Sequence, residues 1–197
     1  VILDKIAPPE EVSAILFEPI QGAAGYIVPP PEFIRGLRKI ADEHGIILID
    51  DEIQSGMGRT GKWWAIEHYN VEPDIILISK ALAAGLPAGA CVSKAELMDW
   101  APGAHENTLG GNPIIMSVAL TVIDIIETEN LLENATEMGN YMKKRLKELM
   151  EKHEIIGDVR GRGLMIGVEF VRDRRTKEPA KNERNAIIKK AFKKGLI

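Results

Sequence analysis

The sequence contains one cysteine among its 197 residues, and only 5% of the residues are aromatic. With Cys91 alone, no disulfide can form within the chain, which is consistent with a reducing compartment. Cys91 lies in an apolar run, so we expect it to be a small core residue. No apolar stretch reaches the length that crosses a membrane, and the first residues do not form a signal peptide. We therefore expect a protein of the cytoplasm, away from membranes.

Positive charge is not in excess either. The formal net charge is -4 at pH 7, and 27% of the residues are charged while 45% are hydrophobic. These values are typical of a globular protein that buries a core. A protein that binds nucleic acid usually carries a basic surface, so we do not expect nucleic acid as a partner.

The first hundred residues alternate between segments typical of strands and segments typical of helices. Apolar runs predict strands at 14–17, 46–50, 75–78 and 89–93. A helix is predicted at 31–44, because apolar residues recur there on one face. This alternation indicates an α/β fold with a mostly parallel sheet and helices on both of its faces.

Longer helices dominate the second half of the chain. Asn112 followed by Pro113 is typical of a helix start and predicts a helix to about residue 127. A second long helix, two strands and a last helix are predicted at 131–153, 159–162, 164–171 and 182–194. The final residues are typical of a helix stop that leads into an apolar run, so we interpret the sequence as a piece of a longer protein.

Reactive side chains follow two of the predicted strands. Asp51 comes directly after the strand at 46–50, and Lys80 follows the strand at 75–78. The stretch between them is long enough for a crossover connection, so both strands can lie parallel and present Asp51 and Lys80 at the same sheet edge. Pyridoxal phosphate requires a lysine amine for its Schiff base and a carboxylate facing its pyridinium nitrogen. The pairing therefore suggests a pyridoxal phosphate site.

Each of these residues also has a simpler interpretation. A lysine after a strand is often solvated, and an acid at a strand end can cap the following turn. Asp50 and Glu52 are rival carboxylates beside Asp51, and Glu18 adds a further side chain at the same predicted edge. Spacing alone leaves both interpretations open.

The glycine-rich stretch 56–62 imitates two nucleotide-binding motifs. Its glycines have the spacing of a dinucleotide fingerprint, and the stretch up to Lys62 resembles most of a phosphate-binding P-loop. A P-loop needs a hydroxyl after its lysine to hold magnesium, whereas Trp63 follows here. The dinucleotide motif needs a helix that opens tightly off the strand, and no helical pattern begins at Gly61. We expect neither motif to bind a nucleotide.

Five segments occur in the order seen in class III aminotransferases. They are Glu18-Pro19-Ile20-Gln21-Gly22, Asp51-Glu52-Ile53-Gln54-Ser55-Gly56, Gly58-Arg59-Thr60-Gly61-Lys62, Ser79-Lys80-Ala81-Leu82 and Thr108-Leu109-Gly110-Gly111-Asn112-Pro113. The chain resembles these enzymes over essentially its whole length. The resemblance implies the α/β fold of fold type I pyridoxal phosphate-dependent transferases. It makes residues 1–127 the C-terminal half of the cofactor-binding large domain, 128–154 a linking helix and 155–197 the start of an incomplete α+β small domain.

The same resemblance implies roles for five residues. Lys80 matches the Schiff-base lysine, and Asp51 matches the residue that pairs with the pyridine nitrogen of pyridoxal phosphate. Gln54 matches a side chain that approaches the phenolic oxygen of the cofactor. Thr108 matches a threonine that reaches the cofactor phosphate of the neighbouring subunit, and Glu18 matches an acid near the cofactor. The family enzymes are typically homodimers, so a site at a subunit interface is implied, with no metal.

The implied reaction moves an amino group from an amine or amino acid to a 2-oxo acid such as 2-oxoglutarate. Relatives that use 4-aminobutyrate, ornithine or acetylornithine often have an acid just after the first motif, where this chain has Ala23 and Ala24. Racemases, epimerases and aminomutases occur in the same family, and no residue of this chain separates them from aminotransferases. A third alternative is a truncated, non-catalytic piece.

Arg59 lies in a glycine-rich turn. We interpret it as a structural residue that anchors this loop.

Overall fold

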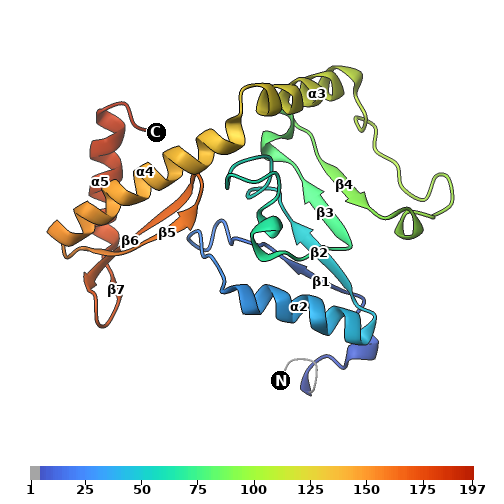
Figure 1. Cartoon of the computed structure of the whole chain (residues 1–197), viewed down its shortest axis with the longest axis horizontal. Coiled ribbons are helices and arrows are strands. Elements are labelled where there is room, and N and C mark those ends of the chain that lie inside the picture. Colours follow the sequence, from blue (N-terminus) through green and yellow to red (C-terminus); the bar gives the residue numbers. More distant parts are fainter. Residues whose placement is uncertain (1–4) are drawn as a thin grey trace.

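The computed structural model describes residues 5–197, which form two β-sheets with helices packed against them (Figure 1). The strands are β1 (Ala14–Phe17), β2 (Ile47–Asp51), β3 (Ile75–Ile78), β4 (Ala90–Ser93), β5 (Ile156–Arg162), β6 (Met165–Asp173) and β7 (Glu178–Pro179). The α-helices are α2 (Pro31–His44), α3 (Pro113–Thr128), α4 (Leu131–Lys152) and α5 (Lys181–Lys193). Short 3-10 helices are η1 (Pro9–Glu11), η2 (Ala65–Tyr69), η3 (Lys80–Ala83) and η4 (Ala95–Leu97).

The first sheet has the strand order β1-β2-β3-β4. β2 pairs parallel with β1 on one side and with β3 on the other, while β4 runs antiparallel to β3. The predicted α/β fold with a mostly parallel sheet is confirmed, and each of its strands lies within one residue of the predicted bounds. Because β1, β2 and β3 are parallel, their carboxyl ends meet at one edge of the sheet.

Helix α2 covers β1 and β2. Pro31 occupies the first turn, where its missing N–H costs nothing, and Gly45 ends the helix in the left-handed conformation with a φ of 66°. Ile34 and Ala41 are buried on the inner side of the helix. Ala41 packs in a cluster with Leu48 of β2, so the amphipathic helix and the sheet share one apolar layer.

Helices cover only one face of this sheet among the described residues. Leu48 packs under α2 and Ile78 packs with residues of α3, and the strand register places both on the same face. No core cluster of residues 5–197 includes a side chain of the opposite face, where Leu16 is 60% exposed. The expected helices on both faces are therefore not found here. Cys91 pairs with Leu77 on this open face and is exposed, so its predicted core position is wrong.

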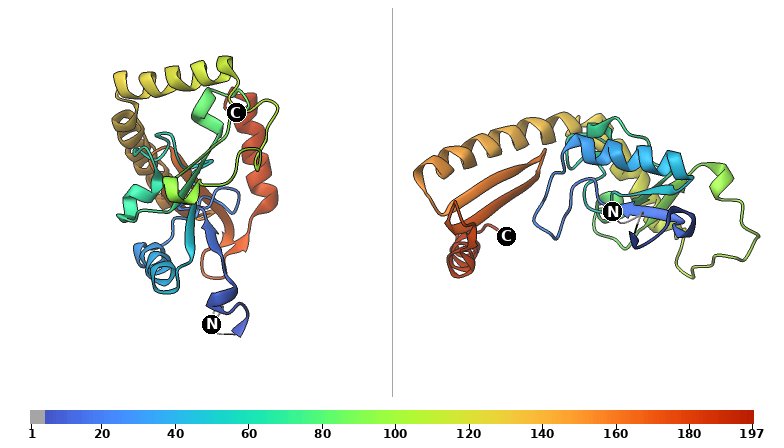
Figure 2. Two further views of the ribbon diagram at one scale, coloured as in Figure 1. Left: turned by 90° about the vertical axis from the view of Figure 1, so that its right-hand side faces the viewer. Right: turned by 90° about the horizontal axis from the view of Figure 1, so that it is seen from below.

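The long helices α3 and α4 lead from the first sheet to the second. The predicted start of α3 is confirmed, because Asn112 Oδ1 accepts hydrogen bonds from the backbone N–H groups of Ile114 (3.0 Å) and Ile115 (3.4 Å). Helix α4 packs against β5 and β6, and together they form a separate layer beside the first sheet (Figure 2). Along residues 5–197, none of the helices combines the length and apolar character that crossing a membrane would require.

The turn between β5 and β6 of the antiparallel second sheet docks onto the glycine-rich loop that follows β2. The backbone N–H of Leu164 in this turn donates to the carbonyl oxygen of Arg59 at 2.9 Å. Gly163 has a φ of 51°, and a Cβ atom at this position would lie 2.7 Å from the same carbonyl oxygen and still closer to Thr60. The lack of a side chain at Gly163 therefore permits the contact between the second sheet and this loop.

Replacing Gly163 with alanine is expected to destabilise the full-length protein by about 1–3 kcal/mol, because the new methyl group meets backbone atoms. Gly36 in α2 provides a matched control, since nothing lies within 4 Å of its Cβ position. Gly36→Ala should stabilise the protein by about 0.5–1 kcal/mol through helix propensity. Urea unfolding of the three proteins measures both changes. A Gly163→Ala midpoint at or above that of the wild type would contradict the described contact.

Candidate active site

Three chemically reactive side chains follow the carboxyl ends of the three parallel strands. Glu18 comes after β1, Asp51 ends β2, and Lys80 lies two residues beyond β3. Because β2 lies between the other two strands, Asp51 is central at this edge. The predicted placement of Asp51 and Lys80 at one sheet edge is therefore what the structure shows. This is the position at which α/β folds commonly bind ligands.

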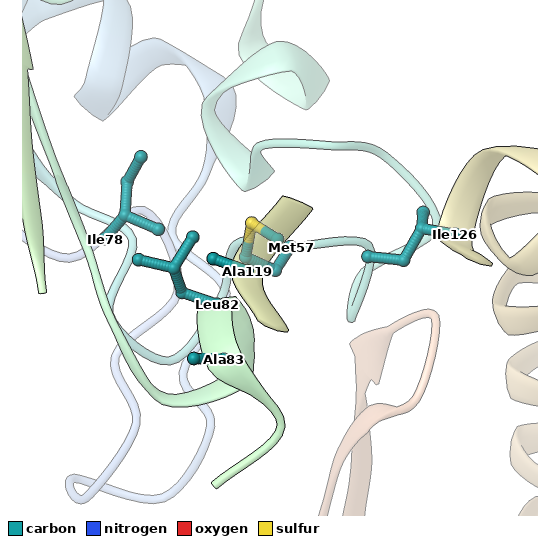
Figure 3. Close-up of a cluster of buried hydrophobic side chains, with 6 residues drawn as sticks. All are labelled: Met57, Ile78, Leu82, Ala83, Ala119 and Ile126. Atoms are coloured by element: carbon teal, nitrogen blue, oxygen red, sulfur yellow. The ribbon is translucent and has the colours of Figure 1, made fainter. Parts of the chain in front are cut away.

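Lys80 is the first residue of η3 and has a φ of 42°. The left-handed conformation is rare for residues other than glycine and costs of order 1–3 kcal/mol, so the surrounding packing must maintain it. Leu82 and Ala83 of η3 are buried beside Met57 and Ala119 (Figure 3). These contacts fix the backbone of Lys80 while its side chain is exposed.

Asp51 is separated from its two neighbouring acids by the geometry of β2. Asp50 and Glu52 are buried, whereas Asp51 is half-buried. Asp51 Oδ1 accepts a hydrogen bond from the backbone N–H of Ile53 at 3.0 Å, and the N–H of Glu52 donates to the carbonyl of Leu77 on β3 at 3.0 Å. Of the three rival carboxylates, Asp51 is thus the one that is accessible at the edge.

Gln54 and Glu18 both contact the loop that follows β1. Glu18 Oε2 accepts a hydrogen bond from the backbone N–H of Gly22 at 2.7 Å. The amide of Gln54 lies against Gly22, so closely that a Cβ atom there would overlap its Oε1. Glycine at this position therefore lets Gln54 approach the loop. A cavity lined by Gly22, Gln54 and Lys80 opens beside this contact.

Arg59 anchors the glycine-rich loop, in agreement with its structural interpretation. Its Nε donates to the carbonyl oxygen of Gln54 at 2.7 Å. No helix opens at Gly61, since the next helical residues belong to η2, which begins at Ala65. The backbone of Gly61 lies against Thr136 of α4 instead. The loop is therefore a packing element that connects the sheet to α4.

Thr108 is not brought to the same edge by this chain. It lies in an exposed loop between η4 and α3, and its side chain forms none of the described hydrogen bonds of residues 5–197. A role at the cofactor phosphate of a neighbouring subunit stays a prediction.

Comparison with known proteins gives the family of the chain. The family model described as aminotransferase class-III matches residues 3–197. The chain belongs to the class-III aminotransferases. It is 52% identical over 187 residues to a leucine/methionine racemase of Thermococcus litoralis. The matched residues make up 94% of this chain and 42% of that protein. It is 44% identical over 192 residues to the 4-aminobutyrate aminotransferase GabT of Escherichia coli, covering 97% of this chain and 45% of that protein.

A solved structure gives the same assignment. A Bacillus anthracis aminotransferase superposes with a TM-score of 0.89 at 37% identity, covering 96% of this chain and 44% of that one. The present chain therefore spans less than half the length of these relatives.

The residues at the edge fit pyridoxal phosphate, the cofactor of class-III aminotransferases. An exposed lysine amine, a half-buried carboxylate and a side-chain amide are the groups that this cofactor requires near its aldehyde, ring nitrogen and phenolic oxygen. Lys80, Asp51 and Gln54 supply these three groups from two adjacent strand ends.

Sequence reasoning missed Arg160 of β5, which lines the cavity that contains Lys80 and Gln54. Its Nε donates to the carbonyl oxygen of Gly25 at 2.9 Å, across 135 residues of sequence. Its guanidinium also pairs with Asp158 (2.8 Å) and Glu169 (2.9 Å) of the second sheet. Nothing local in the sequence marked this contact, because its partner is a backbone oxygen in a distant loop.

Tyr69 of η2 is fully buried, and its hydroxyl donates to the carbonyl oxygen of Pro19 at 2.9 Å. Tyr69→Phe should destabilise the full-length protein by about 1–3 kcal/mol, because it leaves this buried oxygen without a donor. Tyr141→Phe is the control, since Tyr141 is 63% exposed on α4, and it should change stability by less than about 0.5 kcal/mol. Denaturant unfolding tests both values. Equal midpoints for the two variants would show that the Tyr69 bond contributes nothing.

Proposed function

We propose that the protein containing this chain is a pyridoxal phosphate-dependent enzyme that transfers an amino group from an amine or amino acid to a 2-oxo acid. The observation that carries this proposal is the placement of Lys80 and Asp51 at the carboxyl ends of adjacent parallel strands. Membership of the class-III family supports it.

The side chains of this edge have distinct roles in the proposed reaction. Lys80 would hold the cofactor through its amine until the amino donor displaces it, and the freed amine would then carry the proton away from the substrate carbon to the cofactor. Asp51 pairs with the ring nitrogen, and Gln54 donates towards the phenolic oxygen. Pyridoxal phosphate itself supplies an electron-withdrawing ring when bound. Glu18 holds the loop at Gly22 that borders the same space.

The proposed donor is of the 4-aminobutyrate, ornithine or acetylornithine type, and the proposed acceptor is 2-oxoglutarate. The similarity to the Escherichia coli 4-aminobutyrate aminotransferase supports this choice. Ala23 and Ala24 argue against it, because they stand where the resemblance to such enzymes implies an acid.

Racemisation of an amino acid is the second candidate. The 52% identity to a leucine/methionine racemase favours it. The substrate and the product of a racemase carry the same functional groups. A racemase therefore does not need an acid that takes the place of a substrate carboxylate between two different substrates. The alanines at 23 and 24 are consistent with such a site. In this case the Lys80 amine would act on one face of the substrate carbon, and the proton would return to the opposite face.

We also propose a homodimer in the cytoplasm, with Thr108 reaching the site of the neighbouring subunit. Large apolar side chains of α3 are exposed, among them Ile114 (72%) and Leu120 (65%), and the loop that carries Thr108 is exposed as well. Such a surface is typical of an interface. The 197-residue chain alone is expected to be inactive, since residues of the site would come from segments outside it.

Incubation of the full-length protein with an excess of individual amino donors separates the two reactions. Without an acceptor, amino transfer forms about one equivalent of oxo product per bound cofactor, as expected for a ping-pong enzyme. Racemisation instead removes the optical activity of the amino acid and forms no oxo product. If no amino donor gives an oxo product or loses its optical activity, the proposed function is wrong.

Lys80→Ala should lower either activity by at least about a thousandfold, because one group serves as both nucleophile and proton carrier. Lys39→Ala provides the control, since Lys39 is 76% exposed on α2, away from this edge. Its activity should equal that of the wild type. Turnover of Lys80→Ala within tenfold of the control would rule out the assignment of Lys80.

A further inference from the structure

Two acids end β2, a third follows directly after it, and two of the three are buried. Asp50 is 0% exposed and Glu52 is 1% exposed, while Asp51 is half-buried at the candidate site. Because side chains alternate along a strand, Asp50 points to the opposite face of the sheet from Asp51. In register Asp50 lies between Phe17 of β1 and Ile76 of β3, so its neighbours across the sheet are apolar.

Glu52 connects two separate segments. Its Oε2 accepts a hydrogen bond from the hydroxyl of Ser55 at 2.5 Å, and its Oε1 accepts one from the backbone N–H of Ile66 in η2 at 2.8 Å. The first bond closes the turn after β2, and the second ties that turn to η2. Asp51 precedes this turn and Gln54 lies within it, so the Glu52 carboxylate holds two residues of the candidate site in place.

Asp50 has no such partners. Neither of its carboxylate oxygens accepts a hydrogen bond from any group of residues 5–197. An ionised Asp50 would therefore be a buried, unpaired negative charge next to the charge of Glu52, which is a costly arrangement.

Within residues 5–197, no cation pairs with either carboxylate of this acid pair. The titratable residues near it are Glu18 and Asp51, Arg35 and Arg38 of α2, Glu67, His68 and Tyr69 of η2, and Arg162 of β5. The other titratable residues of α2, which are Glu32, Lys39, Asp42, Glu43 and His44, are exposed. Arg35 and Arg162 contact Tyr69, at its carbonyl oxygen and over its ring. Arg38 pairs with Asp74. Strand β3 contributes only apolar side chains. The pair must therefore reduce its charge by keeping a proton.

Burial, and next the neighbouring charge of Glu52, raise the pKa of Asp50 to about 9. Asp50 is then a carboxylic acid at neutral pH. Its hydroxyl group can donate a hydrogen bond to the Glu52 carboxylate.

We propose that Asp50 is a positioning residue that keeps its proton, donates a hydrogen bond to Glu52, and so maintains the turn that carries Asp51 and Gln54 in the orientation that cofactor binding needs. This inference rests on the proposed function, in which Asp51 and Gln54 contact pyridoxal phosphate. Loss of the proton would place two carboxylates against each other in an apolar interior and would loosen the turn.

The pH dependence follows from this proton. The unfolded chain releases it near pH 3.8, the ordinary pKa, whereas the folded protein holds it to about 9. The stability that the proton contributes is therefore fully present below pH 3.8 and is lost as the pH rises through about 9. Affinity for the cofactor should fall about tenfold for each pH unit above that point.

Asp50→Asn tests the positioning role in the full-length protein, because the amide keeps the size of the side chain and supplies a donor that does not titrate. Asp42→Asn is the matched control, since Asp42 is 65% exposed on α2. From pH 9 to pH 10 the protonated share of Asp50 falls about fivefold, so wild type and control should lose about fivefold more pyridoxal phosphate affinity than Asp50→Asn. Equal losses in all three proteins would overturn the proposal.

Infrared spectroscopy of the cofactor-free protein tests the proton directly. Wild type should show the carbonyl stretch of a protonated carboxylic acid at pH 7 and lose it with a midpoint near pH 9, the pKa of Asp50. Absence of this band would overturn the proposal, even where Asp50→Asn does not fold. A wild type that shows the band and binds no pyridoxal phosphate would instead overturn the proposed function, and with it the role of Asp50 towards the cofactor.

Discussion

The parallel pairing of β2 with β1 and β3 is the arrangement on which the rest of the site depends. It places Glu18, Asp51 and Lys80 after three neighbouring strand ends, although they are far apart in sequence. The alternation of side chains along β2 then sends Asp50 into the interior and leaves Asp51 accessible. The alternation of side chains along β2 therefore makes Asp50 a buried structural acid and leaves Asp51 available for chemistry.

The second sheet contributes to the same edge from a distance. The β5–β6 turn binds the carbonyl oxygen of Arg59, and the guanidinium of Arg59 binds the carbonyl oxygen of Gln54. Arg160 of β5 holds the loop at Gly25 on the other side of the cavity. A displacement of the second sheet would consequently be transmitted to Gln54 through these two hydrogen bonds.

Features determined by local sequence could be predicted, and features that depend on distant partners could not. The strands of the first sheet, the start of α3 at Asn112 and the position of Lys80 follow from apolar runs, cap chemistry and motif spacing. The bond of Glu52 to Ile66 and the contact of Arg160 join segments that only the folded chain brings together. The open face of the first sheet was missed because alternation of strands and helices does not reveal which face each helix covers. A two-residue strand such as β7 is too short for any periodicity.

The left-handed backbone of Lys80 has a consequence for the evolution of the chain. Glycine adopts this conformation without strain, so a change from lysine to glycine at position 80 would relieve a local cost of order 1–3 kcal/mol while it removed the amine. Selection for stability and selection for chemistry would therefore oppose each other at this residue. A descendant of this protein that had lost its reaction and kept its fold would be free to accept that change, and glycine at position 80 would then be a recognisable sign of lost catalysis.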